Sequence, residues 1–164
     1  MPKTFEPAED SVGAIAQGII ANYRPELAPA RIMYVFVSEA SKKRGREVLG
    51  NVKKLGTFDA WALEQDFVLT VALDKWNELT GSQRTALVDH LLERCVGEED
   101  EKSGEMKWGV VEPDIQEFPN VLYRHGAWND DLQGFVSVAQ GINLDQIVEE
   151  ETEGESLQQQ SSEE

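Results

Sequence analysis

The sequence has a single cysteine, Cys95, among 164 residues, so neither an internal disulfide nor a cysteine-rich zinc module is expected. No apolar run approaches the roughly 20 residues that a membrane-spanning helix needs. The first ten residues, MPKTFEPAED, lack the apolar core of a secretory signal. These absences predict a cytoplasmic protein.

Basic residues are also scarce. Lysine and arginine total 15 against 31 aspartate and glutamate residues, which gives a formal net charge of −16. Phosphate contacts need lysine and arginine in excess, so direct binding to nucleic acid is not expected. The same charge repels anionic lipid, so no membrane partner is expected either. Hydrophobic residues make up 40% of the chain, which is enough for one ordinary core.

The charges are unevenly distributed. Residues 145–164 carry eight acids and no base, which predicts a disordered acidic tail after a single domain over residues 1–144. The run EEDE at residues 98–101 is expected to form an exposed loop. Residues 41–54 are basic, with Lys42, Lys43, Arg44, Arg46, Lys53 and Lys54. We expect a solvated loop and helix face there, and a phosphate or partner site is the alternative.

Hydrophobic patterning predicts an α+β fold, with a small sheet and three or more helices. Strands are expected over residues 31–37, 67–73 and 106–111, and helices over 11–23, 74–79, 80–95 and 113–126. The expected helix N-caps are Ser11, Asp74 and either Thr80 or Ser82. Trp76 is expected to face the core, and Trp128 and Phe135 to dock onto it.

Few residues could bind a catalytic metal ion. The chain has two histidines, His90 and His125, and one cysteine, Cys95. In the zinc motif H-E-x-x-H, two histidines bind the metal and the glutamate is the general base. Here Leu91 stands at the glutamate position and Arg94 at the second histidine. An apolar side chain cannot activate water, and a guanidinium has no lone pair to donate. The inverted motif H-x-x-E-H fails at the same arginine.

The stretches FVLTVALDKWNELTGSQRTALVDHLLERC and PDIQEFPNVLYRHGAW are distinctive. They resemble the metallopeptidase domain family of bacteriophages and prophages, over about residues 28–130 of this chain. In that family an apolar strand and a short tryptophan-bearing helix precede a helix of the type QR-x-ALVDHELCHC. The matching residues are Trp76, Gln83, Arg84, Ala86, Leu87, Asp89, His90, Cys95, Glu117, Phe118, His125 and Gly126.

The resemblance implies a zincin-like core in which His90 matches the first zinc ligand. Leu91 and Arg94 then replace the general base and the second ligand, and a third ligand could only be Asp114. We therefore expect a pseudo-metallopeptidase, without enzymatic activity and without a cofactor. Arg94 could form an ion pair with Glu93, Asp89 or Asp114 in place of the metal. The weak candidates for metal ligands are His90, Glu93, Asp114 and His125, and Cys95 is a further residue that such a site could include.

A scaffold of this kind with a charge of −16 suggests an interaction protein. We expect it to bind and inhibit a host protein in the cytoplasm of an infected or lysogenic bacterium, and acidity serving only solubility is the simpler alternative. In the form of DNA mimicry, its carboxylates would occupy the basic groove of a nucleic-acid-binding enzyme. The candidate partner-binding residues are Glu98, Glu99, Asp100, Glu101, Asp130, Asp131, Glu149, Glu150 and Glu151. The alternative from the enzyme class is a zinc-dependent metallopeptidase with a site rebuilt around His90.

Overall fold

The computed structural model describes residues 2–141, which divide between Glu112 and Pro113 into two compact units. The domain predicted over residues 1–144 spans both units and stays a prediction. The acidic tail predicted over residues 145–164 lies outside the described residues. Within residues 2–141, none of the helices has both the length and the apolar character needed to cross a membrane.

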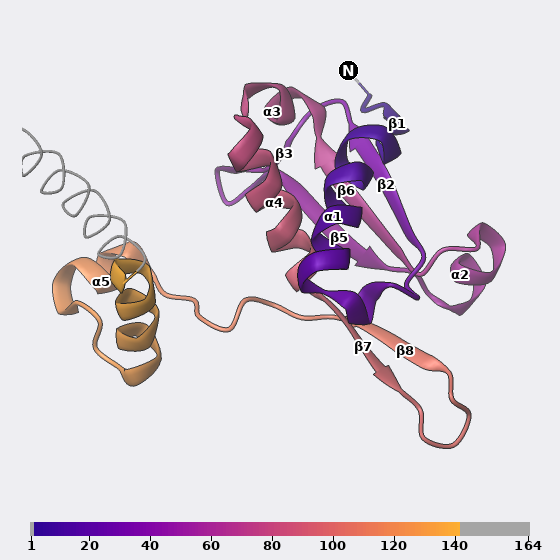
Figure 1. Ribbon diagram of the computed structural model, residues 1–164. Helices are drawn as coiled ribbons and strands as arrows, with labels where there is room; N and C mark the ends of the chain where they lie inside the picture. The colour runs from indigo at the N-terminus through magenta and orange to yellow at the C-terminus, as the bar shows by residue number, and fades with distance from the viewer. Residues whose placement is uncertain (1, 142–164) are drawn as a thin grey trace, which may run out of the picture. The chain divides into compact units, whose positions relative to one another are not determined.

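The first unit is built on a four-stranded sheet of order β1-β2-β6-β5 (Figure 1). The central strands β2 (Ile32–Val37) and β6 (Phe67–Ala72) are parallel and rich in β-branched and aromatic residues, which suit a buried sheet. Strand β1 (Phe5–Pro7) is antiparallel to β2, and β5 (Gly50–Lys54) is antiparallel to β6. The strands predicted over 31–37 and 67–73 are confirmed, and so is the α+β class.

Helices of the first unit enclose its core together with the sheet. A π-helical turn η1 (Glu9–Gly13) leads into α1 (Ala14–Tyr23), and a 3-10 turn η2 (Pro25–Leu27) follows. Helix α4 (Gly81–Glu93) packs beside α1 (Figure 1). The short helices α2 (Thr57–Leu63) and α3 (Leu73–Glu78) flank β6 along the chain. The largest fully buried side chains are those of Phe67, Leu27, Leu69, Leu91, Leu92, Val12, Val71, Val88 and Cys95.

The predicted helix over 80–95 is confirmed, with the N-cap at Thr80. The Gln83 backbone N–H donates to Thr80 Oγ1 at 3.3 Å, and the Thr80 N–H donates to Gln83 Oε1 at 3.0 Å. This reciprocal pair is a capping box, which satisfies two backbone donors at the start of the helix. Trp76 on α3 is buried as predicted, with its ring centroid 5.8 Å from that of Phe36.

Two predicted helix caps are wrong. The first helical segment begins at Glu9, so Ser11 lies inside η1, and its side chain makes no capping bond. Helix α3 begins at Leu73, which places Asp74 in its first turn. The Asp74 carboxylate instead accepts a hydrogen bond from the Ala40 N–H at 3.1 Å. Asp74 thereby ties the segment after β2 to the segment after β6.

The basic stretch forms strands rather than the predicted loop and helix face. Strands β3 (Ser41–Lys43) and β4 (Arg46–Val48) make a hairpin, and β5 follows at once. The turn residues Arg44 and Gly45 both have positive φ, at 51° and 77°. Such a two-residue turn matches the twist of the strands that it joins. Since β3 is exposed along its whole length, its residues lack the apolar alternation by which a strand is recognised.

A second hairpin, β7 (Cys95–Glu99) and β8 (Met106–Val110), confirms the predicted hairpin arm near residue 106. The EEDE loop is only partly as predicted, because Glu98 and Glu99 belong to β7 and the turn begins at Asp100. Alternation fails in this strand too, since Gly97, Glu98 and Glu99 are all exposed.

The second unit is described over residues 113–141. The helix predicted from Pro113 begins only at Pro119, as α5 (Pro119–His125), and Gly126 ends it with a φ of 65°. A residue before proline is held out of the helical region, and Phe118 is accordingly extended. Residues 130–141 are again helical, and the Leu132 N–H donates to Asn129 Oδ1 at 2.8 Å.

The predicted docking of Trp128 and Phe135 onto the core stays a prediction, because both residues belong to the second unit and the core cluster belongs to the first. Their side chains are 56% and 60% exposed, and Leu132 is the buried apolar residue of this segment. The Trp128 Nε1–H donates to Glu117 Oε2 at 3.0 Å, so its polar atom is satisfied within the second unit. A pattern of aromatic residues predicts an apolar face without saying what covers it.

Candidate functional site

His90 and Leu91 face opposite environments on α4. His90 is exposed, whereas Leu91 is only 1% exposed and belongs to the core cluster. Leu91 packs against β5, where a Cβ added to Gly50 would come within 2.8 Å of Leu91 Cδ1. The residue at the general-base position of the motif is therefore a packed core side chain.

Arg94 follows the last turn of α4 and joins three segments of the chain. Its guanidinium donates to the Val111 carbonyl oxygen and Asn51 Oδ1, both at 3.4 Å, and to Glu112 Oε1 at 3.1 Å. The side chain is only 18% exposed. An ion pair in place of the second zinc ligand was expected, but the three predicted partners, Glu93, Asp89 and Asp114, are wrong. Glu112 takes that role because it follows β8, the strand paired with β7 next to Arg94.

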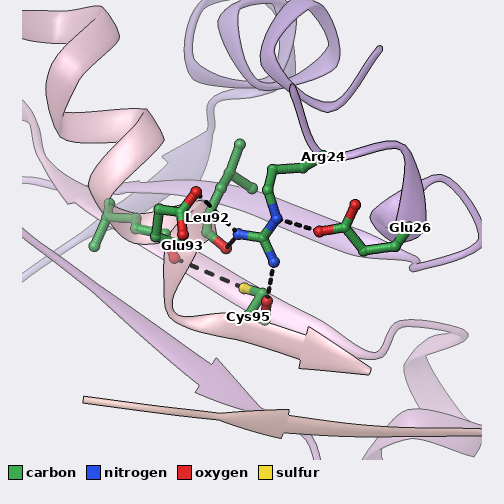
Figure 2. Close-up of polar contacts among 6 residues, drawn as sticks. Arg24, Glu26, Leu92, Glu93 and Cys95 are labelled. Carbon is green, nitrogen blue, oxygen red and sulfur yellow. Dashed lines mark hydrogen bonds and ion pairs between the residues drawn. The ribbon is translucent and has the colours of Figure 1, made fainter. Parts of the chain in front are cut away.

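Glu93 pairs instead with Arg24, at the end of α1 (Figure 2). Arg24 Nη1 donates to the Leu92 carbonyl oxygen at 2.9 Å, and its Nη2 donates to the Cys95 carbonyl oxygen at 2.8 Å. The same guanidinium holds Glu26, and this hydrogen bond lowers the pKa of that carboxyl group. Arg24 therefore adds a second donor to the Leu92 carbonyl, which also accepts from the Arg94 N–H, and it supplies a donor to the Cys95 carbonyl just after α4.

The thiol of Cys95 is buried below Arg24. Its Sγ lies 3.8 Å from the Leu91 carbonyl oxygen, to which it donates. Burial raises the pKa of Cys95 to about 11, more than the nearby Arg24 and Arg94 lower it. Because the thiolate is the form that attacks and binds metals, this cysteine is a packing residue.

The predicted metal candidates are divided between the two units. Across residues 2–141 no three histidine, cysteine, aspartate or glutamate side chains come together in a way that could hold a metal ion. His90 and Glu93 lie in the first unit, whereas Asp114 and His125 lie in the second. With Arg94 at the second ligand position and Glu93 paired to Arg24, the residues present do not fit a zinc ion.

The acidic candidates on the β7–β8 hairpin divide into two kinds. Asp100 accepts a hydrogen bond from the Lys102 N–H at 2.9 Å and pairs with Lys107 at 3.2 Å. Both contacts lower the pKa of Asp100, the backbone bond most, so this residue shapes the turn. Glu98, Glu99 and Glu101 are exposed, although Glu98 lies opposite Lys107 in the ladder. Glu149, Glu150 and Glu151 lie outside the described residues.

In the second unit, Asp130 and Asp131 lie on one hollow with Asp114. The hollow has a volume of about 500 Å³ and is lined by Asp114, Ile115, Asp130, Asp131, Gly134, Phe135 and Val138. The sequence analysis missed its apolar part. The spacing of Phe135 and Val138, three residues apart on one helix, is the signal that could have found it.

A comparison with family models now connects the fold to the sequence motif. The model described as putative phage metallopeptidase matches residues 3–140, which is most of the chain and includes segments of both units. The chain belongs to this family. None of the curated proteins and none of the solved structures matches it significantly. Strand β6 and helix α4, which carry His90, Leu91 and Arg94, lie within the residues of this phage metallopeptidase family member that the family model matches.

Proposed function

We propose that this family member has no peptidase activity and acts by binding a protein partner. The observation that carries the proposal is the fixed guanidinium of Arg94, which three oxygen atoms hold where the motif places a zinc ligand. A guanidinium stays protonated at any physiological pH and offers no lone pair. Its positive charge also opposes a divalent cation at that position.

The general base is missing for a separate reason. Leu91 lies in the core, so the side chain at the base position neither accepts a proton nor reaches solvent. Loss of a general base typically lowers the rate by about 10²–10⁴-fold. Glu93, two residues further along α4, is engaged by Arg24 at 3.5 Å. The two replacements therefore act together against hydrolysis.

The binding role draws its support from charge. The chain carries a net charge of −16, and Glu98, Glu99 and Glu101 are exposed on the β7–β8 hairpin. A surface of this kind attracts a basic partner and accelerates its association. The partner in this proposal is a host protein with a basic groove, such as a nucleic-acid-binding enzyme, which the chain inhibits as a DNA mimic.

The peptidase part is tested by incubating the full chain, expressed with added zinc, with casein and with a mixed peptide library. The expected result is no cleavage above that of a His90→Ala variant prepared in the same way. Cleavage that requires His90 contradicts the proposal and supports the rebuilt zinc site. The binding part is tested by capturing proteins from a bacterial lysate with the full chain at rising salt. Retention of a basic nucleic-acid-binding enzyme, released by moderate salt and inhibited by the chain, is expected, and its absence contradicts the mimicry.

A further inference from the structure

The hollow of the second unit combines an apolar floor with an acidic rim. Ile115, Phe135 and Val138 provide its apolar side chains, and its charged groups are three carboxylates. Its volume of about 500 Å³ is within the range of pockets that accept large side chains or small molecules. The carboxylates are those of Asp114, Asp130 and Asp131.

Two of the apolar side chains that form the floor of the hollow are largely exposed to solvent. Phe135 and Val138 are 60% and 67% exposed, although both lie on one helical segment. Over residues 2–141, seven of the thirteen exposed large hydrophobic side chains lie in residues 113–141. Scattered apolar residues are normal on a protein surface, but a concentration in one short segment marks an interaction site.

Within residues 2–141, the rim has no internal counterion. None of its three aspartates takes part in an ion pair within the part of the chain that is described, unlike Asp66, Asp100 and Glu112 of the first unit. Like charges that share one rim repel one another, and a bound cation relieves that repulsion. The hollow therefore favours a ligand that is apolar at its centre and cationic at its edges.

We propose that this hollow docks a cationic amphipathic helix of a partner protein. Apolar side chains spaced three or four residues apart would cover Phe135 and Val138, and flanking lysines or arginines would reach the three aspartates. The inference rests on the proposed binding function and names the chemistry of the partner. It assigns the contact to residues of the second unit, whereas the zinc motif and the β7–β8 hairpin belong to the first.

Other occupants carry the wrong charge. A second copy of the chain, seated symmetrically, would bring the same three carboxylates against each other. Lipid headgroups of an anionic membrane and the phosphates of nucleic acid are repelled in the same way. Residues 145–164 of this chain have eight acids and no base, so their charge is also opposed to that of the rim.

The test uses the full chain and a fluorescently labelled 15-residue peptide of leucine and lysine, with leucines at helical positions i, i+3, i+7 and i+10. Two control peptides replace the leucines by serine or the lysines by glutamate. Fluorescence anisotropy gives the dissociation constant of each. We expect the leucine–lysine peptide to bind at least about tenfold more tightly than either control, because only it satisfies both floor and rim.

Two sets of variants locate the site. The floor variant Phe135→Ser with Val138→Ser, and the rim variant Asp114→Asn with Asp130→Asn and Asp131→Asn, are each expected to weaken binding about tenfold. The matched control Glu6→Gln with Glu39→Gln and Asp59→Asn removes the same charge from exposed positions of the first unit, and we expect less than about a twofold change. Circular dichroism checks folding, and the floor and rim sets test the same hollow independently.

Equal weakening by the rim variant and the matched control overturns the proposal, because general acidity then explains the binding. Equal binding of the leucine–lysine and serine–lysine peptides also overturns it. The mass of the recovered peptide separates this inference from the proposed function. If the peptide stays intact and the floor and rim variants leave its dissociation constant unchanged, only this inference is contradicted. If the peptide is cleaved, the non-catalytic function is contradicted.

Discussion

The two units of this protein use their polar and apolar residues in opposite ways. In the first unit, Arg24 and Arg94 are each held by several oxygen atoms, and Leu91 and Leu92 are buried beside them. In the second unit, Phe135 is exposed and the aspartates of the hollow have no ion pair among the described residues. The side chains of the first unit are thus mainly engaged with one another, whereas the binding that we propose for the second unit would use side chains that its own contacts leave exposed.

This contrast explains why the motif alone is a poor guide to function here. Helix α4 carries an exposed His90, while Leu91 beside it lies in the core cluster and Arg94 is held by contacts within the first unit. The acidic and apolar side chains that remain available lie elsewhere, on the β7–β8 hairpin and in the second unit. The comparison predicts that changes near the motif affect stability first, and changes at the hollow affect binding first.

The largest effect is expected from Leu91→Glu, the change that would restore the general base of the motif. A carboxylate at this 1% exposed position replaces core packing with an unpaired buried charge. The free energy of unfolding should fall by about 4 kcal/mol or more, as measured by urea denaturation. The conservative change Leu91→Met should cost less than about 1.5 kcal/mol. A stable Leu91→Glu protein that binds zinc would contradict our assignment of Leu91 to the core.

Arg24→Ala should have the next largest effect. The variant removes the side-chain donor of the Cys95 carbonyl and one of the two donors of the Leu92 carbonyl, and the arginine side chain is only 12% exposed. We expect a loss of about 2–4 kcal/mol in the free energy of unfolding, measured in urea. Arg31→Ala removes an exposed arginine paired with Asp66 and serves as the control, with a much smaller expected loss. Equal losses in the two variants would show that burial of the guanidinium does not matter.

A glycine pair tests the β7–β8 hairpin. A Cβ at Gly97 would lie 2.3 Å from Trp108 Cζ3, whereas a Cβ at Gly109 would meet only Val96 Cγ2, at 3.6 Å. Gly97→Ala should therefore displace the Trp108 ring and destabilise the unit by about 1–3 kcal/mol. Gly109→Ala should change stability by less than about 1 kcal/mol. Tryptophan fluorescence together with urea denaturation checks both, and an unchanged Trp108 environment in Gly97→Ala would contradict the close approach.

The smallest effect concerns alkaline pH. Burial raises the pKa of Cys95 to about 11 and that of Tyr34 to about 12, so the folded state holds these protons more tightly than the unfolded state. The stabilisation is complete below pH 9, the ordinary value for the thiol, and is lost as the pH rises to about 11. The urea midpoint should fall less between pH 8 and pH 10.5 in Cys95→Ala than in the unaltered chain. Identical falls in both proteins would contradict this role of the buried thiol.

The sequence predicted those elements whose apolar pattern is strong. Strands β2 and β6 are continuous apolar runs, and α4 has both helical spacing and the Thr80 cap. The β3–β4 hairpin was not predicted, because its exposed residues show no alternation and its charges suggested a loop. The late start of α5 follows from Pro119, which suits the first position of a helix and holds the residue before it in an extended conformation.

The candidate site was less predictable, because it depends on contacts between distant residues. The replacement of two motif residues could be seen in the sequence, but the partners of Arg94 could not. Asn51 and Glu112 come from strands whose pairing is set by the whole sheet and hairpin. The hollow likewise needs Asp114 to meet Asp130 across a turn that no local pattern specifies.

Direct titration of the metal-free full chain with zinc tests the central claim most directly. Isothermal calorimetry of the chain, of His90→Ala and of Arg94→His gives the number of bound ions and their affinity. We predict no stoichiometric binding in any of the three proteins, since His90 lacks partner ligands and Arg94→His restores only one. One zinc ion per unaltered chain, lost in His90→Ala, would contradict the account and return this protein to the metallopeptidases.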